Sequence, residues 1–145
     1  MSNTTVTPNR TGDPTTRRNT LTIRATAVAA GTLAAVAAWA LAVPLAGVEL
    51  AVNRWDGAGT MTVTPALVAT VALGASLAGW AALSVLERLT RHAHVVWTLG
   101  ASIVLLASLA MPMTAAATTA AAVTLTTLHL VVGAVVISTL ARSAR

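Results

Sequence analysis

The sequence predicts an all-α protein, a four-transmembrane-helix bundle with up-down antiparallel topology and both termini in the cytoplasm. Two features of the 145-residue chain lead to this fold class. Apolar residues make up 56% of it and charged residues 9%, whereas a typical soluble domain has about 25% charged residues. The chain also contains four apolar runs, each close to the roughly 20 residues that a helix needs to cross a bilayer. A single membrane domain accounts for both features.

The N-terminal segment, residues 1–24, is expected to be a disordered basic cytoplasmic tail. It is rich in Thr, Asn, Pro and Arg and has no apolar periodicity. The membrane domain then covers residues 25–145, and its first span is predicted over residues 25–48, with a kink or an end near Pro44. The segment TTRRNTLTI resembles a twin-arginine signal. The apolar stretch after it is about twice as long as a signal-peptide core, so we expect a retained helix.

Three further spans are predicted over residues 65–86, 95–113 and 120–140. Pro65 suits the first turn of a helix, and the charged stretch ERLTRHAH separates the second span from the third. Pro112 is expected to close the third span, which a link rich in Ala and Thr joins to the fourth. Residues 49–64 contain Asn, Asp and Gly and are predicted to form a loop.

The arginines predict the orientation in the membrane, because basic residues near span ends remain on the cytoplasmic side. Four crossings place the tail, the second-to-third turn and the C-terminus on one side. That side holds Arg10, Arg17, Arg18, Arg24, Arg88, Arg91, Arg142 and Arg145, and the other side holds Arg54. We therefore expect a multi-pass protein of the plasma membrane with cytoplasmic termini.

Composition and motifs argue against several function classes. The chain has no Cys, which removes disulfide frameworks and thiolate chemistry. It has neither an H-E-x-x-H nor a G-x-S-x-G motif. Its arginines adjoin apolar segments and do not form a basic stripe interleaved with aromatics, so we expect no nucleic-acid partner. We predict no cofactor, metal or catalytic residue; the partners are the lipid bilayer and either a second copy or another membrane protein.

One histidine lies inside the fourth apolar run, in TLTTLHLVVGAVV. Helical spacing puts His129 on one face with Thr126 and Gly133. Ser76 and Ser102 are at a similar expected depth, so each is a candidate hydrogen-bond partner for the imidazole. His129, Ser76, Ser102 and Thr126 are therefore the candidate polar residues of the bundle. The first interpretation is a structural clamp between helices, and the second is a residue that handles protons or contacts a ligand.

A second candidate group lies at the cytoplasmic end of the second span. Glu87 precedes Arg88 directly and Arg91 by four residues, which is ordinary spacing for a local ion pair in an interfacial charge cluster. Trp97 opens the third span, where an amphipathic ring favours the membrane interface. Small residues from Gly74 to Ala82, including Gly79, predict a ridge along which another helix approaches closely.

The segments GWAALSVLERLTRHAHVVWTLGASIVLLASLAMP and LTTLHLVVGAVVISTLAR resemble a family of small four-helix membrane proteins of unknown function found in actinobacteria. The resemblance runs from the first span to the C-terminus. The positions that match the family pattern are Glu87, Arg88, Trp97, Thr98, Ser108, Pro112 and His129. Leu128 stands where the family often has Met. The resemblance implies the fold and a membrane location, and it brings no established activity.

Three functions follow from these features. The first is a structural or accessory bundle that serves a membrane partner. The second is a small proton-coupled transporter that uses His129; against it, every Asp and Glu lies at a helix end or beyond, whereas such carriers use a membrane-embedded carboxylate. The third is an intramembrane enzyme in which Ser102 or Ser108 pairs with His129. The first is favoured, and an enzymatic activity is the least favoured.

The orientation is testable with single introduced cysteines, because the natural chain has none. We expect an impermeant thiol reagent applied to intact cells to label Gly57→Cys and to leave Asn9→Cys unmodified until the cells are opened. The reverse pattern would contradict the orientation.

Overall fold

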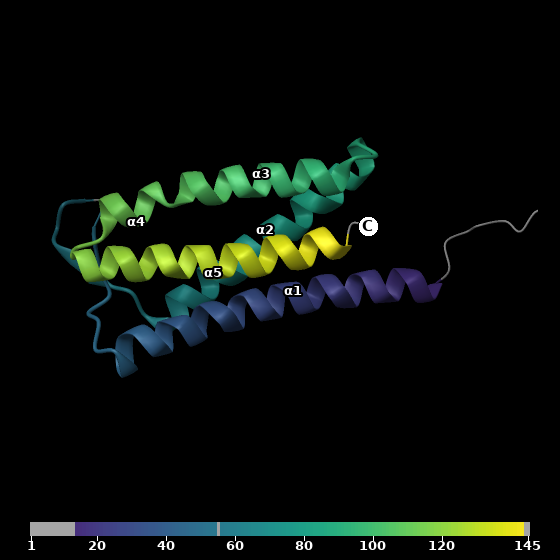
Figure 1. Ribbon diagram of the computed structural model, residues 1–145. Coiled ribbons are helices and arrows are strands. Elements are labelled where there is room, and N and C mark those ends of the chain that lie inside the picture. Colours follow the sequence, from purple (N-terminus) through teal and green to yellow (C-terminus); the bar gives the residue numbers. More distant parts are fainter. Residues whose placement is uncertain (1–13, 55, 144–145) are drawn as a thin grey trace, which may run out of the picture.

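The computed structural model describes residues 14–54 and 56–143, which form a bundle of long helices (Figure 1). The elements in chain order are α1 (Pro14–Ala40), the π-helix η1 (Leu41–Leu45), β1 (Ala51–Asn53), β2 (Thr60–Thr62), α2 (Pro65–Leu89), α3 (Ala93–Ser108), α4 (Ala110–Ala115) and α5 (Thr119–Ser143). Four helical segments are long and apolar enough to cross a membrane, namely Asn19–Leu45, Pro65–Leu89, Ala93–Ala115 and Thr119–Ser143. The prediction of four helices that are long and apolar enough to cross a membrane is confirmed.

The first helix begins earlier than the sequence predicts. Residues 14–24 were assigned to a disordered tail, but α1 starts at Pro14, and its membrane-type segment starts at Asn19. The physical reason is Arg24, which was taken as a charge that ends the span. Its side chain is buried and paired within the bundle, so the helix does not have to begin after it. The rest of the predicted tail, residues 1–13, lies outside the described residues.

The third span is two helices instead of one. α3 ends at Ser108 and α4 starts at Ala110, with Leu109 between them. Pro112 was expected to close this span but lies inside α4. A proline has no N–H, and its ring clashes with the carbonyl group four residues earlier, which here belongs to Ser108. The break at Leu109 is therefore the effect of Pro112, one turn before the proline itself.

The connection between α1 and α2 contains regular secondary structure, where the sequence predicts a loop. Pro44 lies in η1, and Gly47 follows it with a φ of +66°, a conformation that suits the end of a helix. Residues 49–64 then form an antiparallel hairpin in which Val52 pairs with Met61. Val52 also bridges to Ala116 in the α4–α5 link. The prediction of a loop was therefore wrong. Short strands show too few residues for the alternation of apolar and polar side chains by which a strand is recognised in a sequence.

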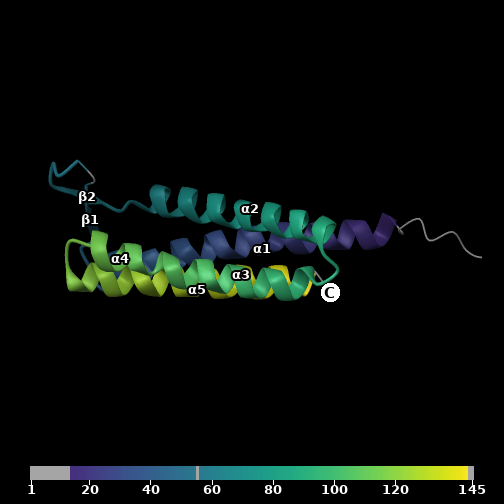
Figure 2. The same cartoon turned by 90° about the horizontal axis from the view of Figure 1, so that it is seen from above.

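The core follows the line where α1, α2 and α5 meet. Figures 1 and 2 show α5 between α3 and α1, with α2 to one side of this row. One buried cluster consists of Ala27, Leu83, Trp97, Val136, Leu140 and Ala141. A second cluster, near the hairpin, consists of Leu50, Val63, Ala121 and Leu128. Trp39 of α1 joins the second cluster and donates its indole N–H to the carbonyl of Val63 at 2.9 Å.

Small residues allow these helices to approach, although not along the whole predicted ridge. A Cβ added at Gly79 would lie 3.1 Å from the ring of Trp97 and 3.5 Å from Leu140, which confirms the contact predicted for Gly79. A Cβ at Gly74 would meet nothing within 4 Å, so this end of the ridge was wrong. Two other glycines lie closer still to a neighbouring helix: a Cβ at Gly133 would lie 2.6 Å from Leu105, and a Cβ at Gly31 would lie 2.7 Å from Val136 and 3.1 Å from the hydroxyl of Ser76.

We expect Gly31→Leu to separate α1 from α5 and to destabilise the bundle by about 1–3 kcal/mol, the usual cost of overpacking. Thermal unfolding in a mild detergent measures this effect. Gly74→Leu is the matched control, because the same change there meets open space. Equal unfolding midpoints for the two variants would contradict the packing of α1 against α5.

Candidate functional site

His129 lies in the middle of α5 and is half-buried. Its Nδ1 lies 2.8 Å from the carbonyl oxygen of Leu125, one turn earlier on the same helix. This backbone acceptor satisfies one ring nitrogen without any contribution from another helix. The position within an apolar helix is as predicted, but among the described residues the imidazole forms no hydrogen bond to another helix of the kind that the structural clamp requires.

Of the candidate partners of His129, Ser76 forms a different hydrogen bond. Ser76 is buried where α2 contacts Gly31 of α1. Its hydroxyl donates to the carbonyl of Ala72 at 2.7 Å. Ser102 lies half-buried on α3, and Thr126 is half-buried on α5 three residues before His129. The predicted hydrogen bond from Ser76 or Ser102 to His129 is therefore not formed. A hydroxyl within a helix reaches its own backbone carbonyl without the need to orient a second helix, which explains the difference.

Glu87 of the predicted charge cluster does form an ion pair, but its partner is neither Arg88 nor Arg91. Glu87 forms an ion pair with Arg24 of α1, through Oε1 of the carboxylate and Nη2 of the guanidinium. Arg88 and Arg91 are exposed, and neither forms an ion pair with the described part of the chain. A surface pair in water is worth little, whereas a guanidinium held inside the bundle needs a counter-charge. The burial of Arg24 therefore decides which arginine pairs with Glu87.

Arg24 connects three helices. Its Nη1 donates to the hydroxyl of Ser84 on α2 at 3.3 Å, and its Nε donates to the hydroxyl of Ser143 on α5 at 3.2 Å. Together with Glu87, these residues form what we call the Arg24 junction. The side chain of Arg24 is 8% exposed, and that of Glu87 is 32% exposed. The junction therefore reaches from the helix interface toward the surface at the end where α1 begins and α5 ends.

Both serines of the junction are polarised toward the arginine. Ser84 donates its proton to the carbonyl of Trp80 at 2.9 Å, and Ser143 donates to the carbonyl of Leu140 at 2.7 Å. A hydroxyl has one proton and two lone pairs, so each oxygen is left as an acceptor for the guanidinium. Charge-assisted bonds of this kind offset the cost of removing an arginine from water.

Trp97, which was predicted to lie at the membrane interface, is 6% exposed and packs within the first core cluster. Its indole N–H is buried and has no hydrogen-bond partner among the described residues. The contact with Gly79 explains this position, because a small residue on α2 leaves space for the ring.

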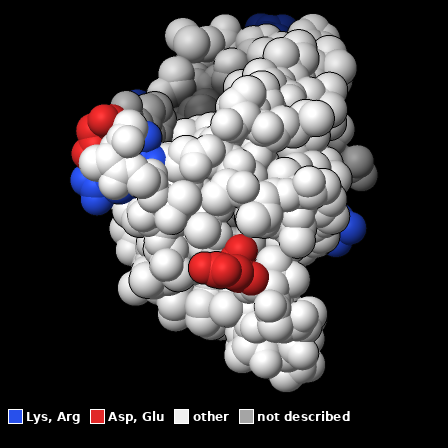
Figure 3. Space-filling model, turned by 90° about the vertical axis from the view of Figure 1, so that its left-hand side faces the viewer, with Lys and Arg blue, Asp and Glu red and all other residues white. Residues whose placement is uncertain are grey.

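The opposite end of the molecule carries the exposed charges of the hairpin. Figure 3 shows this end as a mostly uncharged surface with small acidic and basic groups. Arg54 and Asp56 form an exposed ion pair at 2.9 Å. The pKa of Asp56 is lowered by the hydrogen bond from Arg54 and by the backbone N–H of Ala58. In residues 14–54 and 56–143, no three His, Asp or Glu side chains gather as metal ligands.

A family model described as a family of unknown function, DUF6069, matches residues 15–145. The chain belongs to the DUF6069 family. Among curated proteins and solved structures, no match to the chain was found. The region matched by the DUF6069 model contains the four long helices and the Arg24 junction. The resemblance to a family of unknown function is thereby confirmed, and membership assigns no activity to any residue.

The sequence holds a signal for the Arg24 junction in this DUF6069 chain. Arg24 directly precedes the apolar residues 25–48, and Glu87 directly follows the predicted second span. With four crossings these two positions fall at the same side of the membrane. Opposite charges at the ends of consecutive spans therefore pointed to an interhelical pair, in competition with the local spacing to Arg91.

We expect Glu87→Gln to leave Arg24 without a counter-charge and to destabilise the protein by about 2 kcal/mol. This is less than the roughly 3–5 kcal/mol of a fully buried pair, because Glu87 is partly exposed. Thermal unfolding in detergent measures the loss, and the double variant Arg24→Met with Glu87→Met is expected to recover most of it. Asp56→Asn, which breaks the exposed pair, is the control and should leave the unfolding midpoint nearly unchanged. A cost equal to that of the control would contradict a structural role for the Arg24 junction.

Proposed function

We propose that the protein is a structural or accessory four-helix bundle of the plasma membrane that serves a membrane partner. In this proposal the helices cross the bilayer in an up-down antiparallel order, and both termini are cytoplasmic. The observation that carries the proposal is the closed interior of the bundle, in which α1, α2 and α5 are held together by apolar packing and by the Arg24 junction.

The polar side chains within the helices support a static role. Ser76, Thr98 and Thr139 each donate to a carbonyl one turn earlier on their own helix, at 2.7–2.8 Å. His129 also contacts its own backbone. A carrier needs polar groups whose contacts change between two states of the bundle, whereas these bonds remain within single helices. They favour an accessory protein over a proton-coupled carrier.

The exposed apolar side chains support a location in a membrane, and they leave a surface that a helix of a partner can contact. Leu99, Ile103 and Leu106 on α3 are each more than 60% exposed. An exposed apolar stripe of this size is stable against lipid or against another helix. The third span has the smallest buried share of the four candidate spans, so α3 offers the largest surface to a membrane partner.

The orientation rests on the charges at the end that contains the Arg24 junction. Arg88 and Arg91 follow the end of α2, and Arg142 lies in the last turn of α5. Arg54, at the hairpin, pairs with Asp56. The excess of basic residues therefore supports a cytoplasmic location for the end with the Arg24 junction.

The proposed role is tested in the native membrane. We expect the full chain, solubilised in a mild detergent, to migrate on a native gel in an assembly larger than its own 14.6 kDa allows, and its deletion to lower the amount of the partner. Proteoliposomes of the purified protein should show no solute flux driven by a pH gradient. A pH-driven flux that His129→Leu abolishes would overturn the accessory role and establish the carrier.

We expect His129→Leu to fold and to lower stability by about 0.6 kcal/mol or less, the average for a hydrogen bond between helices in a membrane protein. The bond of His129 is to its own helix, so its loss frees no donor on another helix. Thermal unfolding of the variant beside Thr127→Val, which removes another bond to the same helix, provides the comparison. A loss several-fold larger than that of Thr127→Val would show that His129 holds helices together.

A further inference from the structure

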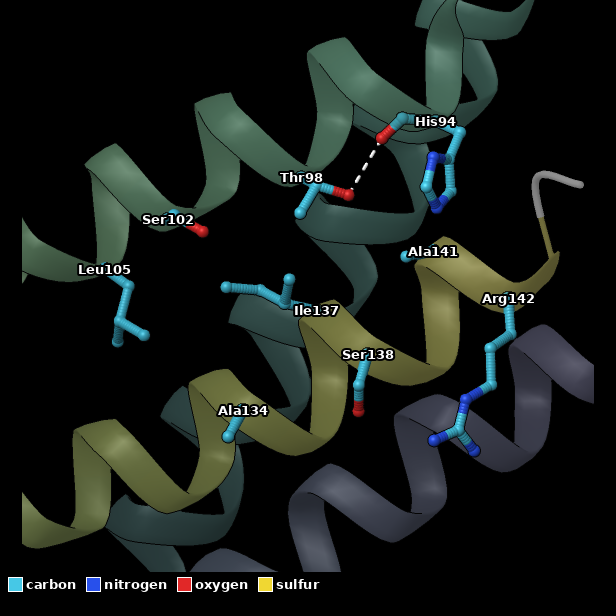
Figure 4. Close-up of a pocket in the computed structure, with 9 residues that line it drawn as sticks. All are labelled: His94, Thr98, Ser102, Leu105, Ala134, Ile137, Ser138, Ala141 and Arg142. Carbon is cyan, nitrogen blue, oxygen red and sulfur yellow. Dashed lines mark hydrogen bonds between the residues drawn. The ribbon is translucent and has the colours of Figure 1, made fainter.

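An open groove of about 460 Å³ runs between α3 and α5 on the side of the bundle shown in Figure 4. His94, Thr98 and Ser102 line it from α3, at steps of one turn. Ser138 and Arg142 line it from α5, also one turn apart. The volume falls within the roughly 300–1,000 Å³ of small-molecule sites. The groove lies on helices that are long and apolar enough to cross a membrane, so its opening faces the bilayer.

The groove changes in character along the helix axis. Its first end is lined by Arg142, in the last turn of α5, and by His94, in the first turn of α3; the side chain of Arg142 extends from α5 away from α3 (Figure 4). Its other end is lined by Leu105 and Ala134. Leu105 is eleven residues beyond His94, which corresponds to about 16 Å at the rise of an α-helix. The groove therefore begins with a cation near the membrane surface and ends among apolar side chains inside the membrane.

Between these ends the groove is lined by residues with hydroxyl groups and by the apolar Ile137 and Ala141. Thr98 and Ser138 lie one turn deeper than His94 and Arg142, and Ser102 follows Thr98 by one more turn. The hydroxyl of Ser102 has no hydrogen-bond partner in the part of the chain that the structure describes, so its proton is available for an acceptor in the groove. Along the groove a cation is followed by hydroxyl groups and then by apolar side chains. This order matches that of the phosphate, the ester groups and the acyl chains in a glycerophospholipid.

We propose that this groove is a binding site for an anionic phospholipid, with its phosphate at Arg142, an ester carbonyl oxygen that accepts from the hydroxyl of Ser102, and the start of an acyl chain against Leu105 and Ala134. Basic pockets between membrane helices commonly hold such headgroups. The inference requires that the helices lie in a membrane, and it does not depend on the accessory role.

Charge decides between a lipid and a second copy of the chain. At this end the carboxylate of Glu87 is already paired with Arg24. Arg88, Arg91 and Arg142 form no ion pair within the described residues. A second copy packed groove against groove would bring like charges together, which is unfavourable, whereas a phosphate supplies the missing negative charge. The occupant that fits is therefore an anionic lipid of the leaflet at this end.

The test is a titration of the purified full chain in detergent with phosphatidylglycerol and with phosphatidylcholine, followed by native mass spectrometry. We expect tighter binding of the anionic lipid, and Arg142→Gln should weaken it about five-fold, as for the loss of one basic residue near a membrane surface. Arg88→Gln is the matched control, because it removes the same charge at the same end but does not line the groove. An equal loss in both variants would replace the site with diffuse surface attraction and overturn the proposal.

A second pair of variants tests the apolar part of the groove without a change of charge. Ala134→Phe should fill the groove and abolish the preference for phosphatidylglycerol, whereas Ile103→Phe, on the exposed face of α3, should retain it. Retention in Ala134→Phe would overturn the proposal. Two further outcomes would also overturn the proposal. Competition by inorganic phosphate as strong as that by the lipid would indicate a site for a free anion. Disulfide-linked dimers of Ser138→Cys in native membranes that phosphatidylglycerol does not suppress would indicate a second copy of the chain.

Discussion

A guanidinium inside an apolar bundle must keep its counter-charge, and this constraint determines how α1, α2 and α5 are arranged. Arg24 is bound to Glu87 and the hydroxyl of Ser84 on α2 and to the hydroxyl of Ser143 on α5. These contacts determine which faces of the three helices meet. The apolar layer below the Arg24 junction follows from this register, because Ala27 lies one turn from Arg24, and Leu83 and Leu140 lie about one turn from Glu87 and Ser143.

The two ends of the bundle are held by different physical means. At one end the Arg24 junction provides directed, charge-assisted bonds. At the other end the hairpin bridges to the α4–α5 link through Val52 and Ala116, and the amide of Ala117 donates to the carbonyl of Ala51 at 3.0 Å. α3 takes part in neither, and it is separated from α4 by the break at Leu109. It is thus the helix whose position depends most on side-chain packing, chiefly that of Trp97.

Long apolar runs were sufficient to predict four spans, because a bilayer requires a minimum length and excludes charge from it. The same reasoning failed at the span ends. It treated Arg24 as a charge in water, although burial with Glu87 makes it part of the helix interior. It also assigned Ser76 and Ser102 to His129 by depth alone, but depth does not determine the direction in which a hydroxyl points. Contacts between helices depend on rotation about the helix axis, and a single sequence specifies this rotation only weakly.

The pairing of Arg24 with Glu87 also has a consequence for the order of biogenesis. The two residues are separated by 63 positions, so Arg24 leaves the ribosome about 3–13 s before Glu87 at usual rates of synthesis. During that interval Arg24 lacks the counter-charge that it has in the folded bundle, and a long basic side chain in this state extends toward water. The environment of Arg24 in the folded bundle therefore requires that α2 has emerged beside α1. Ser143 of α5 completes the network last.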